Sequence, residues 1–224
     1  MSKKINKKRL ELLGKYASAA AILYGVLSVK EFVVVFNTYE DGPTTEDEVL
    51  AMLDEYAKDD DHWLFFAYGG GLIYNSFIFD EESIEDKEWI APLRKEQQDK
   101  PRYLPDKEEF LNYCGDTDYL SPTEAYDDLK QFILTRLDTS EVKDFDIDEE
   151  ILEIPYMIHH GQRPEAVIER FVKRGYKFKS ATLKAIDDAA TFRQKIFKAY
   201  ANTRLYENNG FTIEEYVRDY GERN

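Results

Sequence analysis

The sequence predicts a mainly helical α+β protein with one β-hairpin, and three observations carry this prediction. Three amphipathic helical patterns occupy the first 58 residues, each bounded by a recognisable cap or turn. Residues 62–79 then contain two aromatic and β-branched runs joined through three glycines, which is the pattern of a β-hairpin. Beyond prolines near residue 100, the apolar spacing is helical. Three helices followed by a hairpin is the order of a winged helix. We therefore expect a winged-helix-like module in residues 1–100 and a helical domain in residues 101–224.

The boundaries of the first three helices follow from local chemistry. Apolar residues recur at three- and four-residue spacing over residues 7–24, and Gly25 ends this helix. The four residues from Ser28 have the pattern of a capping box, in which a hydroxyl and a glutamate satisfy free backbone N–H groups. The four residues from Thr45 repeat that pattern and open a third helix.

The hairpin over residues 62–79 carries apolar side chains on both faces of its first strand. One face is expected to pack on the three helices, and the other needs a cover. We expect a later segment of the chain to provide it, with a partner molecule as the alternative. The covering residues would be Ile84, Trp89, Ile90 and Leu93. If that face is open, the residues that would contact a protein partner are Trp63, Phe65, Tyr74 and Phe77.

The second half is predicted to contain a series of capped helices. Their starts are Pro105, the run from Ser121 to Glu124, Pro164 and Ser180. A helix ending at Gly161 contains Pro155, which either kinks it or marks its start. The last long helix carries apolar residues that include Ile186, Phe192, Ile196 and Phe197. Residues 138–150 are an acidic connector.

The composition sets limits on the class of protein. The single cysteine, Cys114, excludes an internal disulfide and a cysteine-rich zinc site. No apolar run approaches the length of a membrane span, so we expect a cytoplasmic protein without membrane contact. The net charge of -15 is uneven: residues 1–40 carry +4, residues 41–155 carry -23 and residues 156–224 carry +4. The acidic middle would repel phosphate backbones, whereas either end could attract them.

The closing run from Tyr200 to Glu215 contains a pattern that helix geometry explains only in part. Asn208, Asn209 and Gly210 favour a helix stop, and Thr212 to Glu215 is a further capping box. The residues left without a role are Asn202, Thr203, Arg204 and Glu207. Asn202, Arg204 and Glu207 could belong to a catalytic centre if they converge on a deep pocket with two or more carboxylates. The alternative is a structural lock, with Arg204 and Glu207 paired on a helix surface.

The same run resembles the "N-T-R-L-W-E-N-N-G-H-T-P-N-E" segment of a group of uncharacterised proteins from low-GC Gram-positive bacteria and their mobile elements. Residues 21–28 are similar to the "N-L-Y-G-V-I-S" opening of that group, whose members often end in a SEC-C zinc-binding module. Tyr206 and Phe211 stand where the group has Trp and His, and no cysteine-rich segment follows. The resemblance implies an architecture and leaves Asn202, Arg204, Glu207, Asn208 and Gly210 as a motif of unknown role.

No residue set in the sequence defines an active site, and we expect no cofactor or metal. His62, His159, His160 and Cys114 lack zinc-ligand spacing, and a solvated helix end is the preferred interpretation of the adjacent histidines. The many carboxylates are interpreted as solvated surface. Gly69 to Gly71 precedes a strand where a phosphate loop would need a helix.

A basic cluster near the C-terminus is the strongest candidate for ligand contact. Its nucleic-acid-binding candidates are Arg170, Lys173, Arg174, Lys177, Lys179, Lys184 and Arg193. Tyr176 and Phe178 lie among them and could stack on exposed bases. By contrast, the third helix presents Glu46, Asp47 and other acids outward, which argues against docking in a DNA groove.

The leading hypothesis is a non-enzymatic adaptor or regulatory protein that acts through contact with an unidentified protein partner, with nucleic-acid contact by the basic C-terminal helices as a further hypothesis. The alternative is an acidic nucleic-acid mimic, or phage-type inhibitor, that occupies the basic groove of a host protein. An enzyme of unknown class is the third hypothesis. Oligomeric state is not predicted.

Overall fold

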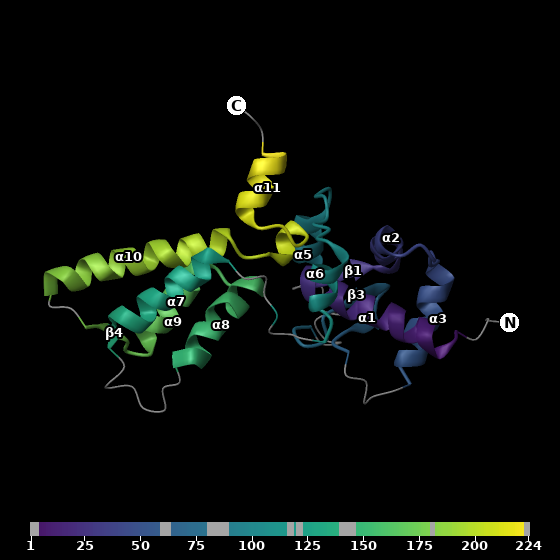
Figure 1. The fold of residues 1–224 in the computed structure, drawn as a ribbon, viewed down its shortest axis with the longest axis horizontal. Helices are drawn as coiled ribbons and strands as arrows, with labels where there is room; N and C mark the ends of the chain where they lie inside the picture. The colour runs from purple at the N-terminus through teal and green to yellow at the C-terminus, as the bar shows by residue number, and fades with distance from the viewer. Residues whose placement is uncertain are drawn as a thin grey trace. The chain divides into compact units, whose positions relative to one another are not determined.

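The computed structural model describes residues 5–58, 64–79, 90–115, 119, 123–138, 147–179 and 182–221. The described residues form ten α-helices, a three-stranded antiparallel sheet near the N-terminus and a two-stranded antiparallel sheet (Figure 1). The predicted mainly helical fold with a β-hairpin is confirmed at this level. The chain divides into two compact units, Met1–Tyr119 and Leu120–Asn224. This division lies beyond the boundary expected near residue 100, because Phe110 and Tyr113 pack into the core of the first unit.

The N-terminal unit is built around its first helix. Its elements in chain order are α1 (Lys7–Tyr24), β1 (Val26–Ser28), α2 (Val29–Tyr39), α3 (Glu46–Tyr56), β2 (Ala67–Gly69), β3 (Leu72–Tyr74), α5 (Ile90–Gln97) and α6 (Lys107–Asn112). Helix α1 contacts α2, α3 and α6, so its buried residues form the centre of the unit. Gly14 stands in the middle of α1, where a Cβ would lie 2.7 Å from Tyr56 Cζ and 2.8 Å from Leu64 Cδ1. The missing side chain therefore allows the end of α3 to approach α1 closely.

The predicted hairpin is present in a shorter form and belongs to a larger sheet. Strands β2 and β3 pair through a turn at Gly70 and Gly71, both with positive φ, which suits glycine. Strand β1 was not predicted; it pairs with the other edge of β3 and places Val26 opposite Tyr74. The sheet order is therefore β1-β3-β2. A three-residue strand that pairs with residues more than 40 positions away leaves no periodic signal in the sequence.

Two of the predicted caps have different outcomes. The capping box between Ser28 and Glu31 is complete at the start of α2. At α3, Thr45 caps the backbone N–H of Glu48, but the Glu48 carboxylate binds the Arg9 guanidinium at 3.0 and 2.8 Å. The expected second half of that box is therefore replaced by a contact between α3 and α1.

Residues 101–105 and α6 are tied to the first two helices by buried polar groups. Tyr24 donates to the carbonyl of Tyr103 at 2.7 Å, and Tyr39 donates to that of Pro105 at 2.9 Å. Arg94 and Arg102 both pair with Glu31. Burial raises the pKa of this carboxyl, but the hydrogen bonds from Ser28 and the charges of Arg102 and Arg94 lower it to about 2. Ile84 and Trp89, half of the expected cover, lie outside the described residues. Ile90 at the start of α5 is buried.

The C-terminal unit is a helical bundle with its own core. Its elements are α7 (Glu124–Arg136), β4 (Leu137–Asp138), α8 (Ile147–His159), α9 (Pro164–Lys173), β5 (Lys177–Phe178), α10 (Thr182–Ala201), the 3₁₀ turn η1 (Tyr206–Asn208) and α11 (Ile213–Tyr220). Helix α10 packs against α7, α8 and α9. The two-stranded antiparallel sheet of β4 and β5 was not predicted, because two-residue strands are too short to show an alternating pattern.

Most predicted helix starts in this region are close to the observed ones. Pro164 opens α9 at its first position, as expected, whereas Pro155 lies inside α8 and does not begin it. The cap of α7 is Thr123, and Pro105 precedes the Asp106 cap of α6. Ser121 and Ser180 lie outside the described residues.

Among the described helices, none combines the length and apolar character needed to cross a membrane.

Candidate functional site

The segment with the unexplained motif forms a compact joint between α10 and α11. Helix α10 ends at Ala201, seven residues before the predicted stop at Asn208. The chain then makes the η1 turn, whose C-cap Asn209 adopts the left-handed conformation with φ of 51°. The backbone N–H of Gly210 returns to the carbonyl of Leu205 at 3.0 Å, and that of Leu205 binds the carbonyl of Phe211 at 3.3 Å. Asn208, Asn209 and Gly210 therefore end the 3₁₀ turn η1 and not α10.

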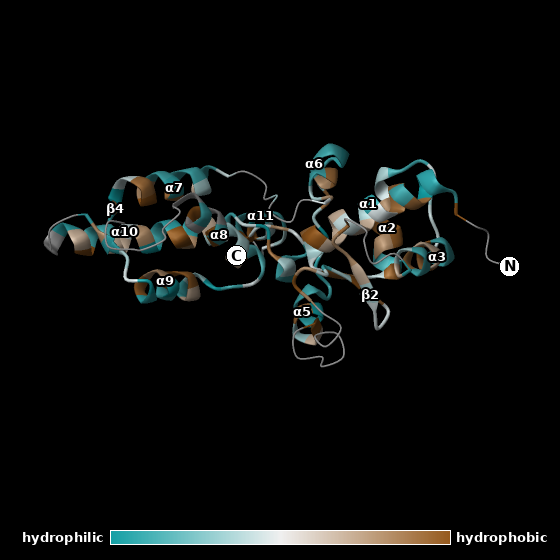
Figure 2. Ribbon diagram, turned by 90° about the horizontal axis from the view of Figure 1, so that it is seen from below, coloured by the Kyte–Doolittle hydropathy of each residue, from teal (hydrophilic) through white to brown (hydrophobic). Residues whose placement is uncertain are grey.

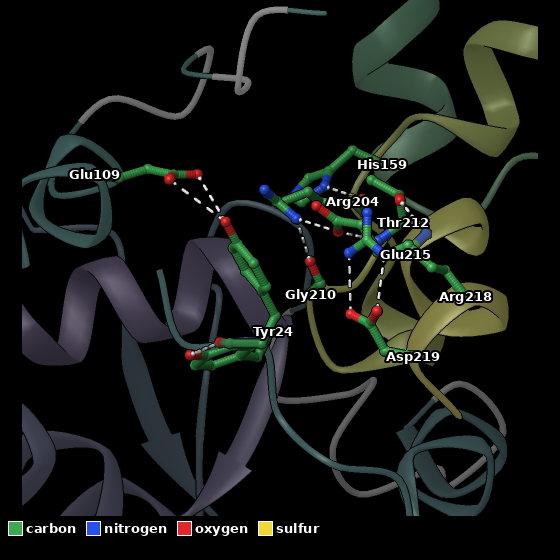
Figure 3. A network of polar contacts seen from close by, with 10 residues as sticks. Tyr24, Glu109, His159, Arg204, Gly210, Thr212, Glu215, Arg218 and Asp219 are labelled. Carbon is green, nitrogen blue, oxygen red and sulfur yellow. Dashed lines mark hydrogen bonds and ion pairs between the residues drawn. The ribbon is translucent and has the colours of Figure 1, made fainter. Parts of the chain in front are cut away.

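Arg204 is the centre of this joint. Its Nη1 donates to the Gly210 carbonyl at 3.2 Å and to Glu215 Oε2 at 2.7 Å, with only 11% of its side chain exposed (Figure 3). Glu215 also completes the predicted capping box with Thr212 at the start of α11. Arg204 thus joins the loop to the following helix through a charge-assisted contact. The expected Arg204–Glu207 pair on one helix surface is wrong, because α10 ends before either residue.

The other motif residues also make contacts within this unit. Asn202 donates to the Lys198 carbonyl at 3.0 Å and to Glu214 Oε1 at 2.9 Å. Thr203 donates to the Ala199 carbonyl at 2.7 Å and forms a very short contact with the Tyr126 hydroxyl of α7. The remaining contacts of the motif are Tyr200 to Glu207 at 3.4 Å and the Phe211 N–H to the Asn208 carbonyl at 3.1 Å. These contacts connect the motif residues to α7, α10 and α11.

The adjacent histidines at the end of α8 are part of the same joint. His159 is buried, with Nδ1 2.6 Å from the Arg204 carbonyl and its ring edge-on to Tyr206 at 4.6 Å. His160 packs on the ring of Tyr156 at 3.9 Å. Burial, and then the neighbouring His159, lower the pKa of His160 to about 3. The expectation of a solvated helix end is therefore wrong, because Tyr206, 46 residues further along the chain, covers it.

A small polar hollow of about 280 Å³ lies beside this joint. It is lined by Thr123, Asn202, Arg204, Thr212, Glu214, Glu215 and Arg218. The charged groups of its wall are engaged: Arg204 binds Glu215, and Arg218 binds Asp219 at 2.7 Å (Figure 3). This arrangement holds two helices together and presents no nucleophile activated by a base. Over the described parts of the chain, no three histidine, cysteine or acidic side chains are grouped as a metal site would require.

The seven basic candidates are spread over α9, β5 and α10. Arg170 pairs with Glu153 and Lys173 pairs with Glu169, while Arg193 lies over the ring of Phe197 at 5.4 Å. Lys177, Lys179 and Lys184 are exposed, and Arg174 caps the end of α9. An open hollow of about 340 Å³ on α9 is lined by Ala166, Glu169, Arg170, Lys173 and Arg174.

The two aromatic residues among these cations face the core of the unit. Tyr176 packs on Phe171 at 5.0 Å, and Phe178 contacts Phe132 and Phe192 at 6.1 Å. They are half-buried by these contacts, so they are not presented as a platform for bases.

The hairpin candidates for protein contact do not share one surface. Tyr74 is buried in β3, whereas Phe77 is 58% exposed. Phe65 is half-buried and meets Phe77 edge-on at 6.4 Å. Trp63 lies outside the described residues. Among the described candidates, Phe65 and Phe77 are therefore in contact, and Tyr68 is a further exposed aromatic residue of β2.

Comparison with protein-family models, with curated proteins and with solved structures gives no match to this chain. The resemblance to the Gram-positive group stays a hypothesis.

Proposed function

We propose that the protein is a non-enzymatic adaptor or regulatory protein whose N-terminal unit is a winged-helix-like module used for protein contact. The order α1-β1-α2-α3-β2-β3 and the sheet order β1-β3-β2 support this interpretation of the module. Helix α3 occupies the place of the helix that enters the DNA groove in winged-helix proteins.

The outward surface of α3 is the observation that carries the proposal. Its exposed residues are Glu46, Asp47, Leu50, Asp54 and Glu55. Glu46, Asp47 and Asp54 lie around Leu50, which is 37% exposed, and this acidic surface would be repelled by a phosphate backbone. Glu55 lies further around the helix and pairs with Lys58 at 2.8 Å. The same surface is complementary to a basic protein segment that offers an apolar side chain. We therefore assign the α3 surface to a basic protein partner.

The non-enzymatic part of the proposal is supported by the motif between α10 and α11. Asn202, Arg204 and Glu207 were the residues around which a catalytic centre could have formed. Each of them is used in contacts that hold the joint.

The test is capture of partners from the source cell by the full-length protein, with and without nuclease, followed by mass spectrometry. The double variant Asp47→Lys/Asp54→Lys should lose the captured protein. Glu108→Lys/Glu96→Lys is the matched control, because it makes the same charge change at exposed helical positions of the same unit. Equal loss in both variants would mean that overall charge, and not the α3 surface, determines binding.

Direct binding measurements complete the test. Purified protein is titrated with duplex DNA, single-stranded RNA and each captured protein at low and moderate salt. Capture of a nucleic-acid-binding protein that DNA displaces would favour the mimic hypothesis instead. Absence of binding to all three classes would refute the adaptor proposal.

Nucleic-acid contact by the basic C-terminal residues is a second candidate function. It is favoured by the exposure of Lys177, Lys179 and Lys184. The pairing of Arg170 and Lys173 with glutamates weakens it. A Lys177→Glu/Lys179→Glu variant should abolish the RNA binding measured by titration. It should leave the capture of protein partners through the α3 surface unchanged.

A further inference from the structure

Helix α10 carries apolar side chains on two sides. Phe192, Ile196 and Ala199 face the core of the C-terminal unit and are buried. Ile186 and Phe197, expected from the sequence to share that role, are instead 64% and 38% exposed. Apolar segments appear along the ribbon of α10 in the hydropathy colouring (Figure 2). Because a helix in a bundle normally presents a polar outer face, this second apolar side needs an explanation.

Four exposed residues of α10, Ile186, Ala190, Arg193 and Phe197, form one straight stripe. Positions 186, 190, 193 and 197 lie within about 60° of one another around the helix axis and extend over about 16 Å. The small side chains of Ala189 and Ala190 lie in and beside the middle of the stripe, which allows another helix to approach closely. Arg193 lies over the ring of Phe197 and adds to the apolar surface through its stem.

We propose that this stripe is a homodimer interface in which α10 of two copies of the chain pack antiparallel about a two-fold axis near Thr191 and Phe192. Ile186 and Phe197 are equally far from that midpoint, so each Ile186 lies opposite the partner's Phe197. Ala190 likewise lies opposite the partner's Arg193. The stripe is thus complementary to itself, as a two-fold interface requires.

The exposed charges beside the stripe favour the antiparallel arrangement. Asp187 and Lys198 are both exposed and lie on the same side of the stripe. In the antiparallel pair, Asp187 is displaced along the helix axis from the partner's Lys198 by only about 3 Å, so two ion pairs form across the interface. In a parallel two-fold pair, Asp187 and the partner's Lys198 would lie on opposite sides of the interface and about 16 Å apart along the helix axis, so neither ion pair would form. Charge complementarity therefore selects a second copy in one orientation. The proposal is independent of the α3 surface and its partner.

The size of the contact sets the expected affinity. A single pair of helices in contact over about three turns buries less than the roughly 1,200 Å² of a typical specific interface. We therefore expect a reversible dimer with a dissociation constant in about the micromolar range. Sedimentation velocity of the full-length protein from about 1 to about 200 μM, in about 0.15 M salt, covers this range.

Replacement of exposed apolar residues by glutamate tests the location of the interface. Ile186→Glu and Phe197→Glu should each leave the protein monomeric throughout this range. Val172→Glu is the matched control, since Val172 is an equally exposed apolar residue on α9, at 70%. It should leave the dimer unchanged. The far-UV circular dichroism of each variant shows whether its helix content equals that of the wild-type protein.

Charge exchange tests the orientation. Asp187→Lys and Lys198→Asp should each weaken the dimer by about tenfold, because each places like charges together. The double variant should restore the wild-type dissociation constant. A wild-type protein that is monomeric throughout, equal loss in the Val172 control, or single charge variants with wild-type affinity would each overturn the proposed interface.

Discussion

Acidification from pH 7.5 to 5 is expected to destabilise the C-terminal unit through His160. The ring of this residue is packed against Tyr156, and burial followed by the proximity of His159 lowers its pKa to about 3. In the unfolded chain a histidine has a pKa of about 6.5. Between these two values the unfolded state binds a proton that the folded state does not. The stabilising contribution is therefore present above pH 6.5 and is lost as the pH falls toward 3.

The size of this loss follows from the two pKa values. The free energy of unfolding should fall by up to about 1.4 kcal/mol per pH unit below pH 6.5, which gives about 2 kcal/mol between pH 7.5 and 5. Urea denaturation followed by ellipticity at 222 nm measures this change for the whole chain. Fluorescence of Trp63 and Trp89, which both belong to the N-terminal unit, measures that unit separately.

The variant His160→Phe keeps a ring against Tyr156 and removes the titrating group. Over the same pH range, its free energy of unfolding should fall by about 2 kcal/mol less than that of the wild-type protein. The unfolding of the N-terminal unit, followed by fluorescence, should be the same in both proteins. Nuclear magnetic resonance titration gives the pKa directly, because the chain has only three histidines. An imidazole signal of His160 that titrates near 6.5, or equal pH dependence in the two proteins, would refute this account of its burial.

The close approach of α1 and α3 and the joint after α10 give two further predictions. Gly14→Ala should lower the stability of the N-terminal unit by about 1–2 kcal/mol, since overpacking against Tyr56 exceeds the gain in helix propensity. Gly42→Ala, where the added Cβ would have an ordinary contact at 3.9 Å, should be close to neutral, and tryptophan fluorescence during urea denaturation distinguishes the two. Arg204→Ala should lower the stability of the C-terminal unit by about 2 kcal/mol, because Glu215 loses a partly buried partner. Arg218→Ala should be neutral in the same ellipticity measurement, because its ion pair is exposed, and equal effects of the two arginine variants would contradict a locking role for the joint.

Local chemistry allowed much of the helical structure to be predicted from the sequence. The Ser28 and Thr212 capping boxes and the proline at position 164 depend only on neighbouring residues, and all three lie where expected. The start of α3 was placed correctly as well, but the partner of Glu48 was not, because Arg9 reaches it from another helix.

The joint between α10 and α11 shows where prediction from local pattern ends. The capping box at Thr212 could be predicted, whereas the partner of Arg204 required knowledge that α10 ends at Ala201. The burial of His159 depends on Tyr206, which lies 47 residues away in sequence. Neither contact follows a fixed sequence spacing, so no sequence pattern could have predicted it.

Helix α10 shows a different limit, because its apolar residues could be predicted but their direction could not. Ile186, Phe192 and Phe197 all fit a helical apolar pattern, and periodicity does not distinguish a side chain that packs inward from one that packs on another molecule. Only the bundle fixes which side is inner, since α7 and α9 cover the side of Phe192. The apolar residues that remain outside are the ones that we assign to a second copy of the chain, on the basis of the charges of Asp187 and Lys198 beside them. The sequence of this helix therefore specifies two contacts, one within the chain and one that we assign to its copy.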